Sequence, residues 1–295
     1  MQRGRLSTFL QFIGDTPPDP SSLNLFRMNL AHRLFIIHGL VFLFATVSLA
    51  QNTRIKDHNN IGWWAGVATF KINDHWGIHS EYQWRREDYV TDWQQGILRL
   101  GLNYQLTPKA QLRVGYAWIE TFNYGDYPLN GFGKDFTEHR TYQMVTLNDK
   151  PGLIEVHNRF ILEQRWIGRY SSPDLTKEDE FPFVNRLRYL LRLQVPLKGP
   201  TLDNREFYAA AYDEILIGFG KNVNENVFDQ NRIGILLGYR FNPKLRIDGG
   251  YFNQIVQLSR EVVLPGSPNG RNVFQFNSGF IVNAFLNVDW RKKID

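Results

Sequence analysis

Residues 272–290 read NVFQFNSGFIVNAFLNVDW, and this stretch decides the fold. Its apolar side chains recur at every second position, and most positions between them are polar. Such alternation is typical of a β-strand with one apolar and one polar face. The stretch exceeds the roughly 5–6 residues of an ordinary soluble strand and reaches the about 9–11 residues that a tilted strand needs to cross a bilayer. The apolar series is Phe274, Phe276, Phe280, Val282, Ala284, Leu286, Val288 and Trp290, and the polar series is Gln275, Asn277, Asn283, Asn287 and Asp289.

The same alternation recurs upstream, where turn signals divide the chain into eleven predicted strands. These strands cover residues 61–72, 76–87, 93–106, 110–122, 137–147, 153–168, 183–197, 207–219, 229–241, 245–258 and 272–290. Mostly short connections (73–75, 107–109, 148–152, 198–205, 242–244) alternate with mostly longer ones (88–92, 123–136, 169–182, 220–228, 259–271). This pattern is typical of outer-membrane barrels, which have short periplasmic turns and long extracellular loops.

The predicted number of strands conflicts with the even number found in single-chain bacterial barrels. Residues 51–60 could thread the lumen, one predicted strand could lie outside the wall, or a break could have been missed. The sequence therefore predicts an all-β, antiparallel transmembrane β-barrel of about 10–12 strands.

Composition narrows the function classes. The mean hydropathy of −0.37 excludes a bundle of membrane helices, and the aromatic fraction of 15% suits interfacial girdles. The chain has no cysteine, which excludes disulfides and thiolate chemistry. The net charge of +5 comes from interspersed residues, so no nucleic-acid partner is expected.

The N-terminal region contains one strongly apolar run, Leu34 to Ala50, preceded by Arg33. We interpret residues 28–50 as a signal peptide and residues 1–27 as an upstream extension or a misassigned start. The alternative is a retained membrane anchor. A polar segment (51–60), the barrel (61–290) and a short tail (291–295) follow. Export together with the strand pattern predicts the outer membrane of a Gram-negative cell.

The apolar faces of the strands are expected to contact membrane lipid in a monomeric barrel. Several of them carry Trp or Tyr near an end, where such rings settle at the headgroup level. The rows include Trp76, Ile78, Tyr82 and Trp84; Leu98, Leu100, Leu102, Tyr104 and Leu106; Leu112, Val114, Tyr116 and Trp118; and Ile233, Ile235, Leu237, Tyr239 and Phe241. The alternative is a soluble β-sandwich or lipocalin-like barrel with these faces inside.

The polar faces carry charges of both signs, which need partners inside a lumen of this size. Glu81, Glu155, Glu163 and Asp213 or Glu214 are the expected counter-ions of the arginines. The predicted lumenal network, which would line any ligand site, consists of Arg85, Glu155, His157, Arg159, Glu163, Arg165, Arg186, Arg188, Arg192, Asp213, Glu214 and Arg232.

Several motifs resemble an uncharacterised family, domain of unknown function 2490 (DUF2490). They are HNRFILEQRW (157–166), NRLRYLLRLQVPL (185–197), AYDEI (211–215), FDQNR (228–232) and the pairs Gly115-Tyr116 and Gly250-Tyr251. The resemblance covers roughly residues 59–290 and implies an exported barrel assigned to the outer membrane, without an established activity. The motif residues are Arg159, Glu163, Arg165, Arg186, Arg188, Asp213, Glu214, Asp229, Asn231 and Arg232.

No catalytic residue, metal site or cofactor is predicted. His79 and Ser80 are adjacent and point to opposite faces of a strand, and His139 and His157 have no serine beside them. No histidine and carboxylate spacing typical of zinc occurs.

Three functions are therefore compared. The first is a structural or binding barrel with a salt-bridged lumen. The second is a narrow channel whose basic lumen favours a small anionic solute. The third, an outer-membrane lipid hydrolase, lacks the residues it needs.

Overall fold

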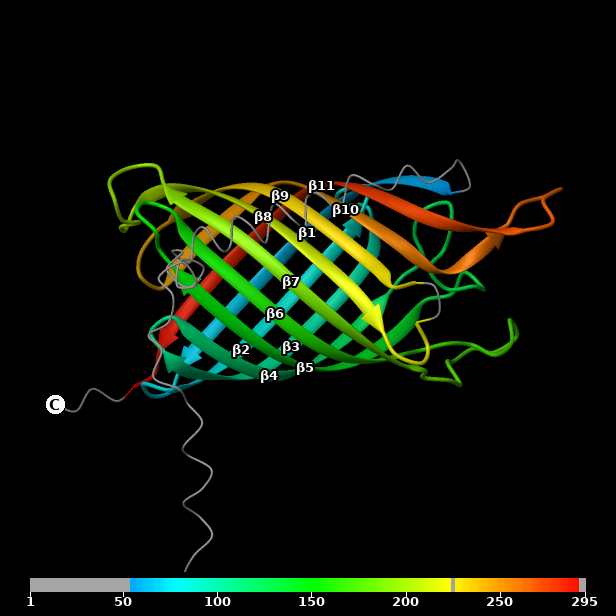
Figure 1. Ribbon diagram of the computed structural model, residues 1–295, viewed down its shortest axis with the longest axis horizontal. Coiled ribbons are helices and arrows are strands. Elements are labelled where there is room, and N and C mark those ends of the chain that lie inside the picture. The colour runs from blue at the N-terminus through cyan, green and yellow to red at the C-terminus, as the bar shows by residue number, and fades with distance from the viewer. Residues whose placement is uncertain (1–53, 224–225, 292–295) are drawn as a thin grey trace, which may run out of the picture. The chain divides into compact units, whose positions relative to one another are not determined.

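The computed structural model describes residues 54–223 and 226–291, and these form one closed barrel (Figure 1). The predicted upstream extension, the signal peptide, residues 51–53 and residues 292–295 lie outside the described part. The strands are β1 (Ile55–Lys71), β2 (Trp76–Glu87), β3 (Asp92–Thr107), β4 (Ala110–Thr121), β5 (Phe136–Asp149), β6 (Glu155–Ile167), β7 (Phe183–Pro196), β8 (Glu206–Phe219), β9 (Phe228–Arg240), β10 (Leu245–Val263) and β11 (Gly270–Asp289).

Each strand pairs antiparallel with its neighbours in the sequence, and β1 and β11 close the wall as a parallel pair. An up-and-down barrel with an odd number of strands must close in this way, because its first and last strands run in the same direction. The all-β barrel is confirmed, and the count of eleven lies within the predicted range. The antiparallel description holds for every pair except this closing one.

The first strand begins six residues before its predicted start at residue 61. Residues 55–60 are paired with residues 273–278 of β11 and therefore belong to the wall. They do not thread the lumen, and the predicted boundary between a polar segment and the barrel is displaced. The sequence pattern did not reveal this part of the strand because both of its faces are polar. His58 and Asn60 lie on one face, and Asp57 and Asn59 lie on the other.

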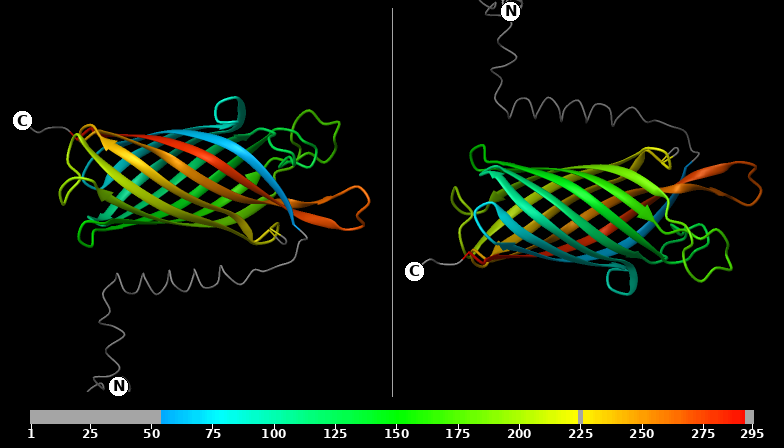
Figure 2. Two further views of the ribbon diagram at one scale, coloured as in Figure 1. Left: turned by 90° about the horizontal axis from the view of Figure 1, so that it is seen from above. Right: turned by 90° about the horizontal axis from the view of Figure 1, so that it is seen from below.

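Two ends of the barrel differ in their connections, as Figure 2 shows. At one end, which we call the turn end, lie the residues 72–75, 108–109, 150–154, 197–205 and 241–244. At the other, the loop end, lie the residues 88–91, 122–135, 168–182, 220–223, 226–227 and 264–269. The β10–β11 hairpin projects beyond the wall at the loop end (Figure 2). The described residues contain no helix long and apolar enough to cross a bilayer.

The outer surface of the wall is largely apolar, while its inner surface carries most of the charged side chains alongside small apolar clusters. The predicted rows face outwards, with Leu100 49% and Ile235 67% exposed, whereas lumenal Arg186 and Glu138 are 1% and 2% exposed. Apolar residues are usually buried and charged residues exposed, and this wall shows the reverse. The apolar faces therefore do not form an interior core, so the sandwich alternative is wrong.

Aromatic contacts on the wall gather towards both ends. At the turn end, the ring centroids of Phe70 and Trp290 lie 4.4 Å apart, and those of Trp76 and Tyr104 lie 4.8 Å apart. Near the loop end, a chain of ring contacts runs through Phe122, Trp93, Trp84, Trp64, Phe280 and Tyr89.

The closing pair depends on Gly279, which lies opposite Ile61. A Cβ at residue 279 would lie 1.7 Å from the backbone oxygen of Ile61, so Gly279→Ala should force the two strands apart. We expect the free energy of unfolding to fall by about 3 kcal/mol or more, because an overpacked backbone contact relaxes poorly. Urea unfolding in detergent measures this change.

Gly66→Ala is the matched control, because it changes the same residue type on the same closing pair. A Cβ at residue 66 would have no heavy atom within 4 Å. Equal stability of the two variants would show that close backbone approach at Gly279 is unimportant for closure.

Candidate functional site: a charged waist between two lumenal cavities

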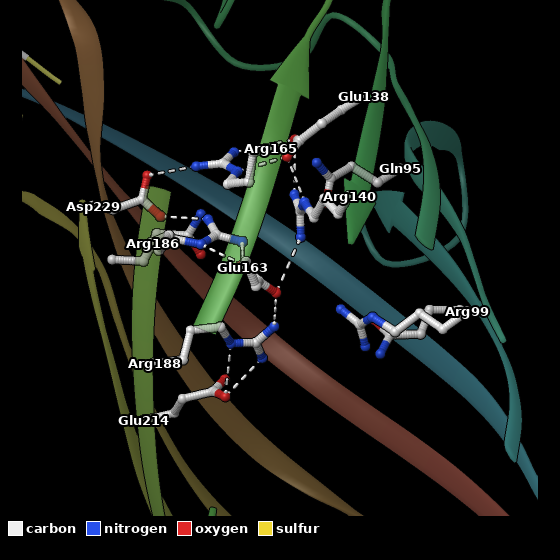
Figure 3. A network of polar contacts seen from close by, with 12 residues as sticks. Gln95, Arg99, Glu138, Arg140, Glu163, Arg165, Arg186, Arg188, Glu214 and Asp229 are labelled. Carbon is white, nitrogen blue, oxygen red and sulfur yellow. Dashed lines mark hydrogen bonds and ion pairs between the residues drawn. The ribbon is translucent and has the colours of Figure 1, made fainter. Parts of the chain in front are cut away.

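Six charged side chains form a closed ring of alternating sign inside the barrel (Figure 3). They come from four strands, β5, β6, β7 and β9. In order around the ring they are Arg165, Glu138, Arg140, Glu163, Arg186 and Asp229. We call this set the charge ring. Its formal charges cancel.

Glu138 is the most heavily bonded carboxylate of the charge ring. Arg165 donates from Nε at 2.6 Å and from Nη2 at 3.1 Å to its two oxygens. Arg140 donates from Nη2 at 2.8 Å and also from Nε. Both arginines therefore hold Glu138 in the bidentate geometry that suits a planar guanidinium and a carboxylate.

The ring closes through longer contacts and one contact that skips a strand. Arg140 lies 3.8 Å from Glu163, and Arg165 lies 3.7 Å from Asp229. Arg186 on β7 donates to Glu163 at 2.7 Å and to Asp229 on β9. The residue paired with Arg186 on the intervening strand β8 is Gly218, which puts no side chain between them.

A branch extends the charge ring towards the turn end. Arg188 donates to Glu163 at 2.8 Å and to Glu214 at 2.7 Å. Glu214 also accepts from Arg159 at 3.0 Å and from Arg232 at 3.2 Å. Glu214 thus neutralises part of the charge of three arginines, and the branch carries more positive than negative charge.

The opposite side of the lumen presents Trp63 on β1. The guanidinium of Arg85 lies 3.6 Å from the centroid of the indole ring, and that of Arg232 lies 5.1 Å from it. Cations over an indole face are attracted by its quadrupole. The indole N–H donates to Gln94 at 2.7 Å. Trp63 therefore links the β9 side of the network with β2 and β3.

Most of these groups are almost inaccessible to water, and the Arg159 side chain is the exception at 34% exposed. Trp63, Arg85, Glu163 and Arg188 are 2–4% exposed. In such surroundings the attraction between paired charges is strong, but each lost partner leaves a costly unpaired charge. We call the charge ring, its branch, Trp63 and Arg85 the waist.

Two cavities lie against the waist and share Trp63, Arg85 and Arg232 as lining residues. The loop-end cavity, about 340 Å³, is lined by residues of loops 122–135, 168–182 and 220–227 together with Ser259 and Arg260. The turn-end cavity, about 370 Å³, is lined by residues such as Thr69, Arg113, Arg246 and Asn287. Side chains of the waist thus line both cavities.

Loop 122–135 folds inwards over the β1–β11 pair. The Tyr124 hydroxyl donates to Gln275 at 2.8 Å, and the backbone of Gly125 donates to Glu87 at 3.0 Å. Burial raises the pKa of Tyr124 to about 12, so its hydroxyl keeps its proton at physiological pH. Gly125 has a φ of +71°, and a Cβ there would lie 2.8 Å from Asp57, which explains the glycine.

A second polar cluster lies near the turn end. Asp248 on β10 accepts from Arg192 at 2.7 Å, from Tyr208 at 2.9 Å and from Asn283 at 2.8 Å. His157 contacts Asn148 at 2.7 Å. This cluster joins β7, β8, β10 and β11 across the lumen.

Most of the predicted network residues lie in the lumen, but in several groups. The waist contains Arg85, Arg159, Glu163, Arg165, Arg186, Arg188, Glu214 and Arg232. Arg192 belongs to the Asp248 cluster, and Glu155 accepts from Gln194 at 2.8 Å nearer the turns.

The prediction is wrong for Asp213. Its side chain is on the outer face of β8, where it accepts from Asn231 at 2.7 Å. The period of two forces this result, because the neighbouring Glu214 points into the lumen. Only one of two adjacent acids can face inwards.

The sequence analysis did not place Glu138, Arg140, Trp63 or Asp248 in the network. A signal for the first two is present: Glu138 and Arg140 are spaced by two residues, as are Glu163 and Arg165 on the next strand. Trp63 carried no such signal, because a tryptophan on a barrel strand usually faces lipid.

The described residues contain no cluster of three or more histidine and acidic side chains arranged to hold a metal ion. His79 contacts Glu81 at 3.2 Å, and Glu81 also pairs with Arg99 at 2.6 Å. His139 lies on the outer face, where it contacts the Tyr116 hydroxyl at 2.6 Å.

Fold and site together define a closed up-and-down β-barrel with an apolar outer wall and an ion-paired lumen. The chain belongs to the family described as "protein of unknown function (DUF2490)", which matches residues 61–263. The resemblance found in the sequence is therefore confirmed. No curated protein matches the chain.

The charge ring predicts a large effect of Glu163→Gln. This change leaves Arg140, Arg186 and Arg188 with less negative charge in a water-poor site. We expect the free energy of unfolding to fall by about 3–5 kcal/mol, as when one partner of a buried pair is removed. Urea unfolding in detergent measures it.

Glu180→Gln is the matched control, since it makes the same chemical change at an exposed residue in loop 168–182. We expect its stability to stay within about 0.5 kcal/mol of the unchanged protein. A small effect of Glu163→Gln, similar to that of the control, would mean that the ring contributes little to the fold.

Proposed function

We propose that this protein is a monomeric outer-membrane β-barrel with a structural or binding role, and that its lumen is not an open pore. The observation that carries this proposal is the waist, where a neutral ring of ion pairs and a buried tryptophan separate two cavities. A wall of eleven strands also encloses less space than the 16–18 strands of open porins.

A membrane location is supported by the outer surface. Apolar side chains are exposed on every side of the wall, and aromatic contacts gather near both ends. Apolar surface of this extent is unfavourable when exposed to water and favourable when it contacts lipid. Apart from the projecting end of the β10–β11 hairpin, the described wall leaves no unpaired strand edge, which suits a single chain in a bilayer.

We also propose that the protein is not an enzyme. The described charged groups of the waist are engaged with one another or with amides and an indole. Such an arrangement explains the charges as structural ion pairs, which are the commoner reason for this kind of pattern.

The rival function is a narrow anion channel, and conductance separates the two. We expect the full chain, purified in detergent and inserted into a planar bilayer, to show no steady channel openings. Insertion is verified independently by protease protection of the membrane-embedded strands. Steady, anion-selective conductance would contradict the closed waist and support the channel.

Lipid contact predicts that arginine is poorly tolerated on the outer wall. Leu100→Arg and Leu237→Arg change residues that are 49% and 55% exposed. Each should weaken insertion, by about 2–4 kcal/mol where the side chain lies near the midplane and less towards the interface. Folding yield into vesicles across a urea series measures the change.

Leu153→Arg provides the control, because Leu153 is 55% exposed but lies in a turn between β5 and β6. It should insert normally. Normal insertion of all three variants would contradict a lipid-facing wall and favour a soluble barrel or one covered by other proteins.

A further inference from the structure

The turn-end cavity has an unusual excess of positive charge. Eight arginines and two glutamates line it, and every basic side chain other than its two histidines is an arginine. The arginines are Arg85, Arg99, Arg113, Arg159, Arg188, Arg192, Arg232 and Arg246, and the acids are Glu81 and Glu214. Even after all nearby ion pairs form, a positive potential is left in this compartment.

Two of these arginines are held by neutral groups. Arg113 donates from Nε to the side-chain oxygen of Asn103, and Arg246 lies 4.4 Å from the ring centroid of Phe285. Within the described residues, no carboxylate lies at ion-pairing distance from either guanidinium. Arg113 also hydrogen-bonds the Tyr142 side chain, and neither guanidinium is neutralised by a described ion pair.

Three buried donors on the cavity wall also make no hydrogen bond to the protein. They are the Nε atoms of Arg159, Arg232 and Arg246, as seen within the described residues. Buried donors in folded proteins are nearly always satisfied by protein, water or a ligand. These three donors can therefore bond to a polar group that occupies the cavity.

The cavity is reached from the turn end. It shares Thr69, Gln111 and Asn287 with a wider mouth of about 620 Å³, which is bordered by the turns at 72–75 and 241–244. The loop-end cavity, in contrast, is covered by three loops and has the waist beneath it. A solute entering from the turn end therefore reaches Arg113 and Arg246, which lie near the turn end of β4 and β10, before it reaches the arginines of the waist.

We propose that the turn-end cavity is a binding site for a small multivalent oxyanion, one that carries several phosphate or carboxylate charges. Guanidinium groups bind both through two parallel N–H donors. The volume of about 370 Å³ admits a solute of pyrophosphate or citrate size. The barrel wall separates the cavity from lipid headgroups, so the ligand is a soluble one. This inference rests on the closed waist of the proposed function, which makes the cavity a dead-end site.

Calorimetric titration of the full chain in a neutral detergent tests the site. Pyrophosphate and citrate are added at constant ionic strength, with acetate as the monovalent comparison. We expect saturable binding of one multivalent anion per chain and weaker binding of acetate. Absence of saturable binding for both multivalent anions, or equal affinity for acetate, would overturn the proposal.

Substitutions locate the site. Arg246→Gln and Arg113→Gln should each weaken binding by about 10- to 100-fold, the loss expected for a hydrogen-bonded charge. Arg246→Lys keeps the positive charge but cannot donate two parallel hydrogen bonds, so it should reduce the affinity for the anion less than Arg246→Gln does. It also provides a test if the glutamine variants fold poorly, which heat-modifiable gel mobility reveals.

Arg169→Gln is the control, because Arg169 is exposed and lines the loop-end cavity. It should bind the anion as the unchanged protein does. Equal weakening by this control, or no weakening by the turn-end changes, would place binding elsewhere and overturn the proposal.

A further titration distinguishes soluble anions from lipid headgroups as the ligand. Adding phosphatidylglycerol to the micelles should leave the affinity unchanged, whereas competition would place the site on the outer surface and overturn the proposal. Conductance distinguishes a failure of this binding site from a failure of the closed waist in the proposed function. A silent, inserted barrel that binds no anion refutes this site alone, while a conducting barrel refutes the closed waist whatever it binds.

Discussion

Closure of the wall is the constraint on which the rest of the structure depends. The parallel β1–β11 pair supplies hydrogen bonds to two strands that would otherwise be exposed edges. Once the sheet is closed, every side chain faces either the lumen or the outside, and adjacent residues face opposite ways. The apolar outer surface and the charged lumen both follow from this alternation of side chains in a closed sheet. Gly279, with Ile61 directly opposite, shows how closely the two backbones approach to make it.

Closure also creates the electrostatic problem that the waist solves. Side chains from four strands meet in a space with little water, and a charge left alone there would be strongly unfavourable. Glu138, Glu163 and Asp229 each form ion pairs with arginines of two different strands, so no carboxylate depends on a single partner. A network with this redundancy fixes the relative positions of its strands as well as neutralising charge. The same side chains occupy part of the lumen.

Much of this could be predicted from the sequence because a strand has a period of two. The predicted strands match the observed ones to within two residues except at the start of β1 and the end of β10. The alternation also predicts that Glu163 and Arg186 both face inwards, but the long loop 168–182 between their strands does not reveal that they are directly opposite. The beginning of β1 could not be found in this way, because residues 55–60 have no apolar outer face to reveal them.

The contacts that skip strands could not be predicted either. Arg186 reaches Asp229 across β8 only because Gly218 stands between them, and spacing along the chain contains no information about that path. The approach of Trp63 to Arg232 likewise depends on the curvature of the closed sheet. Sequence identified which residues face inwards, while barrel geometry decided which of them meet.

The uneven distribution of acids along the lumen is the strongest sign of a role beyond stability. If the lumenal charges existed only to support one another, acids and arginines would balance along the whole length. They balance in the charge ring, where three carboxylates meet three guanidinium groups. They do not balance in the turn-end cavity, where Arg113 and Arg246 rest against an amide and an aromatic ring. Neutral residues at these two positions would avoid the cost of desolvating a cation. A structure that neutralises its charges at the waist and retains an excess beside it therefore has positive charge available for a solute.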